Sequence, residues 1–165
     1  MWLLRLAAAA GVLLAGGGLG AQLSRRLEQK RRALQDALFF LRRVQVRGQT
    51  GGGFWPEELA AAAADGGFAV MQFPTSLPED IPPEELAVWV VRSADTENLL
   101  EDAAQILCAA LQCALTRTET LSRLEYYIRM LEQQLDLARQ REERDKKLYW
   151  QLGWLGGALL AVILW

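Results

Sequence analysis

Few residues of this chain could perform chemistry. The 165 residues contain no histidine, which excludes histidine acid/base catalysis, histidine-activated nucleophiles and histidine metal ligands. The two cysteines, Cys108 and Cys113, are too few to build a zinc site or a disulfide framework. Carboxylate pairs such as Glu84–Glu85 are adjacent in sequence, so on a helix their side chains point in different directions. We therefore expect no enzymatic activity, no cofactor, no metal ion and no small-molecule substrate.

Phosphate and nucleic-acid binding also lack support in the sequence. Residues 48–53 are rich in glycine, but they lack the Gly-Lys-Ser/Thr ending of a P-loop, and no buried strand precedes them. The formal net charge is −2, from 18 Lys and Arg against 20 Asp and Glu, which argues against general binding to nucleic acid. We interpret residues 48–53 as a linker and expect no nucleic-acid partner.

Both ends of the chain are apolar. Residues 1–21 contain one charged side chain, Arg5, and residues 148–165 contain none. A run of about 18 or more apolar residues is a candidate for a transmembrane helix. We expect an N-terminal transmembrane helix at 1–21 and a C-terminal transmembrane helix at 148–165. The alternatives are a cleaved signal peptide at the first end and a buried core helix at the second.

The positive charges beside these runs predict the orientation in the membrane. Lysine and arginine are retained on the cytoplasmic side, so residues 22–147 would be cytoplasmic and both termini would face outward. Small residues four apart in each run would let the two helices approach each other closely in lipid. These candidate packing residues are Gly16, Gly20, Gly153 and Gly157.

Hydrophobic periodicity between the two runs predicts an all-α fold: a small cytoplasmic helical bundle flanked by two transmembrane helices. We expect helices at about 22–47, at 57–64 after Pro56, from Pro83 onward, at about 96–115, and from Leu121 into the second span. The last helix has a 3-4-3-4-3 apolar spacing, typical of a seam that packs along another helix. We expect it to pack antiparallel against the first long helix. The residues of the seam are Leu121, Leu124, Ile128, Leu131, Leu135 and Ala138.

Charge is unevenly distributed along the cytoplasmic part. Residues 22–47 contain eight basic and two acidic side chains, whereas residues 51–104 contain eleven acidic side chains and one basic one. Either segment could bind a partner, although a topology signal and solvated helix starts would give the same pattern. The candidate partner-binding residues are Glu79, Asp80, Glu84, Glu85, Glu97, Arg25, Arg26, Arg31 and Arg32.

Three stretches of the sequence together resemble a known family. They are Lys147-Leu-Tyr-Trp-Gln-Leu-Gly-Trp-Leu-Gly-Gly157 with its aliphatic tail, the spaced helix Leu124 to Ala138, and Leu34-Gln-Asp-Ala-Leu38 after an apolar span. This layout resembles the stage III sporulation protein AB family of endospore-forming bacteria. The resemblance implies a helical bundle similar to the cytoplasmic domain of type II secretion platform proteins.

The resemblance also implies a function and partners. The chain would be a membrane platform component of the secretion-like complex that joins mother cell and forespore, in the mother-cell membrane that faces the forespore. Its partners would be a secretion-type ATPase similar to stage III sporulation protein AA and other stage III sporulation channel proteins. The alternative is a membrane-anchored scaffold or regulator unrelated to sporulation, which would share the same physical features.

Overall fold

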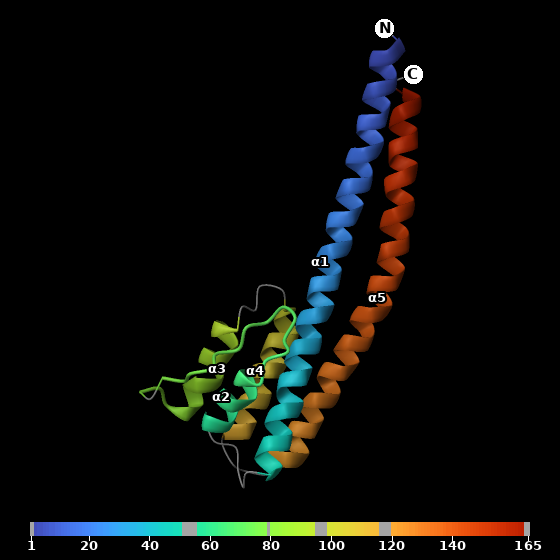
Figure 1. Cartoon of the computed structure of the whole chain (residues 1–165). Helices are drawn as coiled ribbons and strands as arrows, with labels where there is room; N and C mark the ends of the chain where they lie inside the picture. The colour runs from blue at the N-terminus through green and yellow to red at the C-terminus, as the bar shows by residue number, and fades with distance from the viewer. Residues whose placement is uncertain (1, 51–55, 79, 95–98, 116–119, 164–165) are drawn as a thin grey trace. The chain divides into compact units, whose positions relative to one another are not determined.

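The described residues of this computed structural model form helices and loops without a strand, so the predicted all-α fold is confirmed for them. The structure describes residues 2–50, 56–78, 80–94, 99–115 and 120–163. Figure 1 shows the helices in chain order. They are α1 (Trp2–Thr50), α2 (Pro56–Ala64), α3 (Pro83–Ser93), α4 (Glu101–Leu115) and α5 (Thr120–Ile163).

The helix boundaries differ from the predicted ones mainly in the long helices. The first span and the basic helix form one continuous helix, α1, and the seam helix continues into the predicted second span as α5, as expected. The helix expected from about residue 96 begins at Glu101, and Leu99 and Leu100 precede it without helical structure. Proline opens α2 and α3, as expected, because its fixed φ suits the first helical turn, where its missing N–H costs nothing.

The backbone divides into two compact units. Unit 1 combines Met1–Glu28 with Ala138–Trp165, and unit 2 consists of Gln29–Leu137. Each unit therefore contains part of α1 and part of α5. The predicted domain boundaries after residues 21 and 147 stay a prediction.

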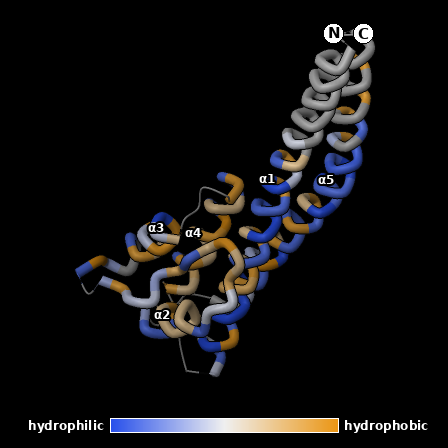
Figure 2. The backbone as a smooth tube through the Cα atoms, turned by 45° about the horizontal axis from the view of Figure 1, so that its top comes forward, coloured by the Kyte–Doolittle hydropathy of each residue, from blue (hydrophilic) through white to orange (hydrophobic). Residues whose placement is uncertain are grey.

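Unit 1 contains a charged and an apolar section of α5. Charged residues dominate from Arg139 to Lys147, the hydrophilic stretch beside the α5 label in Figure 2. Beyond it, four leucines recur at a 4-3-4 spacing on one side of the helix, and between 48% and 68% of each is exposed. We call this set the leucine face; its members are Leu148, Leu152, Leu155 and Leu159.

The two predicted transmembrane helices are not supported by the described residues. Within the described part of the chain, no helix contains a stretch long and apolar enough to cross a membrane. Most side chains of the predicted spans at 1–21 and 148–165 lie outside the described residues.

The core of unit 2 lies where α1, α4 and α5 present their apolar faces. The predicted seam is buried from Leu124 to Leu135, with Leu124 and Leu131 fully enclosed. Each enclosed leucine contributes about 2 kcal/mol relative to an exposed position. Helix α3 packs against α4. The other buried core residues of α1 and α4 are Ala33, Leu34, Ala37, Leu38, Phe40, Leu41, Val44, Ala103, Leu107, Ala110, Leu111 and Ala114.

A buried carboxylate fixes the loop that follows α2. Asp36 of α1 is only 6% exposed. Its carboxylate accepts hydrogen bonds from the backbone N–H groups of Ala69 (2.9 Å), Val70 (2.7 Å) and Met71 (3.0 Å). Hydrogen bonds to an ionised acceptor are stronger than neutral ones, and three converging donors compensate for removing the charge from water.

The same loop adds an aromatic cluster to the core. Gly66 and Gly67 have positive φ angles of 64° and 84°, which let the chain reverse direction after α2. Phe73 then stacks on Phe40 of α1, with ring centroids 4.0 Å apart, and Phe68 meets both rings edge-on. The loop is therefore held to α1 by both polar and aromatic contacts.

We predict that Asp36→Asn destabilises the fold. Asparagine has one acceptor oxygen and no charge, so it leaves some of the three N–H groups without their partner. The expected loss is about 2 kcal/mol in the free energy of unfolding, measured by circular dichroism of the full chain during denaturation. Asp80→Asn makes the same chemical change at an exposed position and should shift stability by less than about 0.5 kcal/mol. Equal effects of the two variants would contradict the role assigned to Asp36.

Candidate functional site

The most distinctive surface feature of unit 2 is a hollow of about 560 Å³ along the outer side of α1. Six of its seven lining residues come from α1, and Asp65 comes from the turn after α2. Two of them, Phe39 and Val46, are large apolar side chains that are 44% and 57% exposed. We call this hollow the arginine groove; its lining residues are Phe39, Arg42, Arg43, Val46, Arg47, Thr50 and Asp65.

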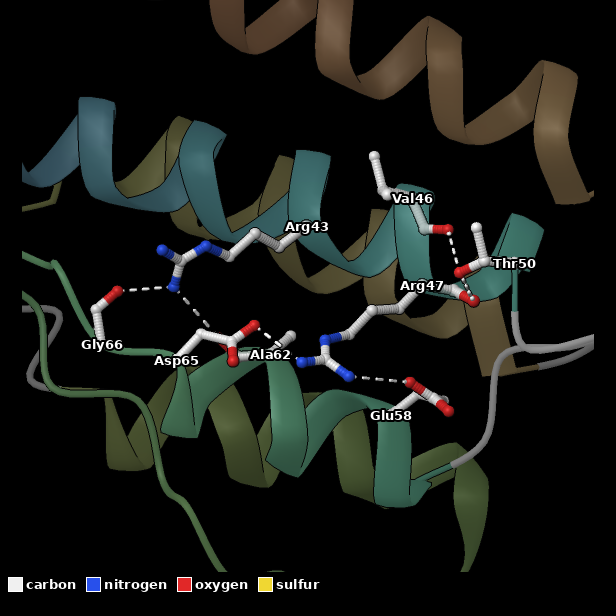
Figure 3. A network of polar contacts seen from close by, with 8 residues as sticks. All are labelled: Arg43, Val46, Arg47, Thr50, Glu58, Ala62, Asp65 and Gly66. Carbon is white, nitrogen blue, oxygen red and sulfur yellow. Dashed lines mark hydrogen bonds and ion pairs between the residues drawn. The ribbon is translucent and has the colours of Figure 1, made fainter.

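Arg43 is held in the groove by neutral groups. Its guanidinium lies 4.1 Å from the centre of the Phe39 ring and 5.5 Å from that of Phe68. It also donates hydrogen bonds to the backbone carbonyls of Gly66 and Ala62, as Figure 3 shows. Among the residues that the structure describes, Arg43 makes no ion pair. Its charge is therefore positioned by rings and carbonyls and is not neutralised by a carboxylate in contact with it.

Arg47 joins α1 to α2 by ion pairs. Its guanidinium lies 2.8 Å from a carboxylate oxygen of Asp65 and 3.4 Å from one of Glu58 (Figure 3). The hydrogen bond from Arg47 lowers the pKa of Asp65, and the same bond raises the pKa of Arg47. Beside this pair, the Thr50 hydroxyl donates to the carbonyls of Val46 and Arg47 at the end of α1. The groove is therefore bounded on one side by a charged link between two helices.

Arg42 forms the opposite boundary of the groove. Its guanidinium pairs with the carboxylate of Glu132 on α5. Both side chains are more than a third exposed, so the pair contributes little to stability and mainly fixes the position of the Arg42 side chain.

A second hollow, of about 470 Å³, lies on the acidic part of unit 2. It is formed by the start of α2, the loop before α3 and the first turns of α3, and all but one of its lining residues are apolar. We call it the proline pocket; it is lined by Pro56, Glu57, Ala60, Leu77, Pro78, Ile81 and Leu86.

The structure separates the predicted partner-binding residues. Arg25, Arg26 and Arg32 are exposed on α1, as are Asp80 and Glu85 in the acidic segment. Arg31 is half-buried and donates a hydrogen bond of 2.8 Å to the side chain of Gln35. None of these six residues lines either hollow. Glu79, Glu97 and the side chain of Glu84 lie outside the described residues.

Sequence reasoning missed the arginines that do line a hollow. Arg42, Arg43 and Arg47 fell inside the predicted basic helix but were not singled out. A signal was present, because Phe39, Arg42, Arg43, Val46 and Arg47 follow the i, i+3, i+4, i+7, i+8 spacing of one helix face. This face is opposite to the buried one, so its apolar members stay in contact with solvent.

The glycines predicted to pack between the two spans lie in the long helices. Gly16 and Gly20 belong to α1, and Gly153 and Gly157 belong to α5. Their role in packing stays a prediction.

In the described part of the chain, no cluster of three or more side chains could hold a metal ion.

The two cysteines are free thiols of α4. Cys108 and Cys113 are both half-buried, and burial raises the pKa of each, partly offset at Cys113 by the nearby Arg123. Partial burial and a raised pKa are unlike the exposed, low-pKa state of a reactive cysteine.

Comparison with known protein families gives a match to the C-terminal part of the chain. Residues 90–165 match the family model of stage III sporulation protein AB. The resemblance noted in the sequence is confirmed for this range, which contains the end of α3 and all of α4 and α5. The match to stage III sporulation protein AB implies a role in sporulation. Neither the curated proteins nor the solved structures contain a match.

We predict that the ion pair between Arg47 and Asp65 stabilises the fold only above acidic pH. Because the folded-state pKa of Asp65 is lowered, its contribution is present above the ordinary carboxylate range and is lost as the pH falls through that lowered pKa. Asp65→Asn should therefore lower the melting temperature at neutral pH and have no effect in strong acid. Arg47→Gln should follow the same pH profile. A difference from the unmodified chain that persists unchanged into acid would contradict this account.

Proposed function

We propose that the protein is a membrane platform component of the complex that joins mother cell and forespore during sporulation, and that it docks a secretion-type ATPase. The observation that carries this proposal is the family match over residues 90–165. The role is structural and not catalytic, in agreement with a sequence that has no histidine.

Membrane anchoring at both ends is supported by the sequence and by the exposed leucines. Residues 1–21 and 148–165 have the length and composition of spans. The leucines of the leucine face are each between 48% and 68% exposed, and lipid tails would cover such a surface. The basic residues that follow the first span and precede the second favour a cytoplasmic position for residues 22–147.

ATPase docking is supported by the acidic part of unit 2. Glu57, Asp80 and Glu85 are exposed there, and Glu57 borders the proline pocket. A basic partner segment with an aliphatic side chain could place that side chain in the pocket and its charges near these carboxylates.

The topology is tested by labelling single cysteines. In a variant with Cys108→Ala and Cys113→Ala, a cysteine is introduced either by Gly52→Cys or after Trp165. A maleimide that cannot cross membranes should label the terminal cysteine in intact cells and should label residue 52 only after the cells are opened. Labelling of residue 52 in intact cells would disprove the proposed orientation.

The docking surface is tested by charge reversal. We expect Glu57→Lys combined with Glu85→Lys to weaken co-purification with the secretion-type ATPase by about tenfold, because two attractive charges become repulsive. The control is Glu125→Lys combined with Glu143→Lys, which makes the same change in net charge on exposed positions of α5. Undiminished recovery of the ATPase by the first variant, or an equal loss in both, would exclude this surface.

A further inference from the structure

We propose that the arginine groove binds an acidic peptide segment of a partner protein, with an apolar side chain of that segment inserted between Phe39 and Val46. The groove is lined by α1 and Asp65, and the proline pocket by entirely different residues. The inference therefore does not depend on ATPase docking at the acidic surface.

The apolar part of the groove has the size and spacing of a side-chain site. Phe39 and Val46 are seven residues apart on one helix, which places them two turns, or about 10 Å, from each other. Both are among the few large apolar side chains of unit 2 that remain substantially exposed. A volume of about 560 Å³ falls within the usual range of ligand pockets. A partner's leucine or phenylalanine would bury both residues at once.

Arg43, at the centre of the lining, favours an acidic occupant. Three arginines and one aspartate line the groove, and Glu58 and Glu132 bring two further carboxylates against two of these arginines. Arg42 and Arg47 already contact the carboxylates of Glu132, Glu58 and Asp65. Among the described residues Arg43 contacts rings and carbonyls and forms no ion pair, although its charge helps to lower the pKa of Asp65. It is therefore the groove arginine to which a partner carboxylate could add a direct ion pair.

Arg43 is also positioned before any partner arrives. Its guanidinium is held over Phe39 and bonded to two backbone carbonyls, so little side-chain entropy remains to be lost on binding. The planar guanidinium has five N–H donors, more than its two carbonyl partners require. A carboxylate could therefore pair with Arg43 while the contacts within the chain are retained.

An acidic peptide fits these features better than a lipid surface does. Recognition of anionic lipid generally uses clusters of four to eight lysines and arginines, whereas the groove has three arginines, two of them already paired with carboxylates. Its apolar side chains line a hollow, which suits a single inserted side chain. The expected ligand is a segment in which aspartates or glutamates flank one large apolar residue.

A peptide selection on the full chain in detergent tests the inference without assuming a partner. A displayed library of random peptides is selected on the unmodified protein, and the recovered peptides are measured by fluorescence anisotropy. We expect enrichment of acidic residues around an aliphatic or aromatic residue. Val46→Glu should weaken binding about tenfold or more, since it removes an apolar contact and adds a repulsive charge. Glutamate is a good helix former, and Val46 is 57% exposed, so the fold should be retained.

Val88→Glu is the matched control, because it makes the same substitution at a 44% exposed valine of α3, outside the groove. Peptides without acidic enrichment, or equal binding by the two variants, would overturn the proposal. Displacement of the peptide by phosphatidylglycerol but not by phosphatidylcholine in mixed micelles would assign the groove to lipid and overturn it. If the selection fails and the chain forms dimers that Val46→Glu dissociates, the groove binds a second copy of the chain. That result would also overturn the proposal.

Discussion

The carboxylate of Asp36 positions the segment after α2 and, through that segment, the arginine groove. It holds the N–H groups of residues 69–71 against α1, and so determines where the preceding loop can lie. That loop contributes the Gly66 carbonyl and the Phe68 ring, and both contact the guanidinium of Arg43. The arginine groove therefore exists because a buried acid, one to three turns earlier on the same helix, fixes the segment that positions its central cation.

Some of the basic side chains of α1 form ion pairs with acidic side chains of the segment that follows it. Sequence composition separates a basic helix from an acidic segment, but Arg47 pairs with Glu58 and Asp65 of that segment. These contacts are partly exposed, so they contribute little to stability and mainly orient α2 against α1. The acidic surface available to a partner is correspondingly smaller than the sequence suggested. Of the three groove arginines, Arg43 is the one without an ion pair among the described residues.

The sequence predicted the parts of the fold that depend on local periodicity. The apolar spacing from Leu124 to Leu135 identified the buried face of α5, and prolines correctly marked the starts of α2 and α3. The role of Asp36 could not be predicted, because its partners lie more than thirty residues away along the chain. The groove could be predicted only in part for the same reason. The helix face that contains Phe39 and Val46 is visible in the sequence, but the contacts of this face with Asp65 and Phe68 depend on the tertiary fold.

The arginine groove lies outside the part of the chain that the family model matches. The match covers residues 90–165, whereas the groove is formed by residues between Phe39 and Asp65. The matched range contains all of α4 and α5, including the packed seam and the apolar end. Phe39, Arg43 and Val46 lie outside that range, on the side of α1 opposite its buried residues, where Phe39 and Arg43 contact Phe68 of the segment after α2. Contacts with Gly66 and Phe68 account for the positions of Arg43 and Phe39 within the chain. The exposed part of Phe39, together with Val46, leaves the apolar surface that the proposed peptide would cover.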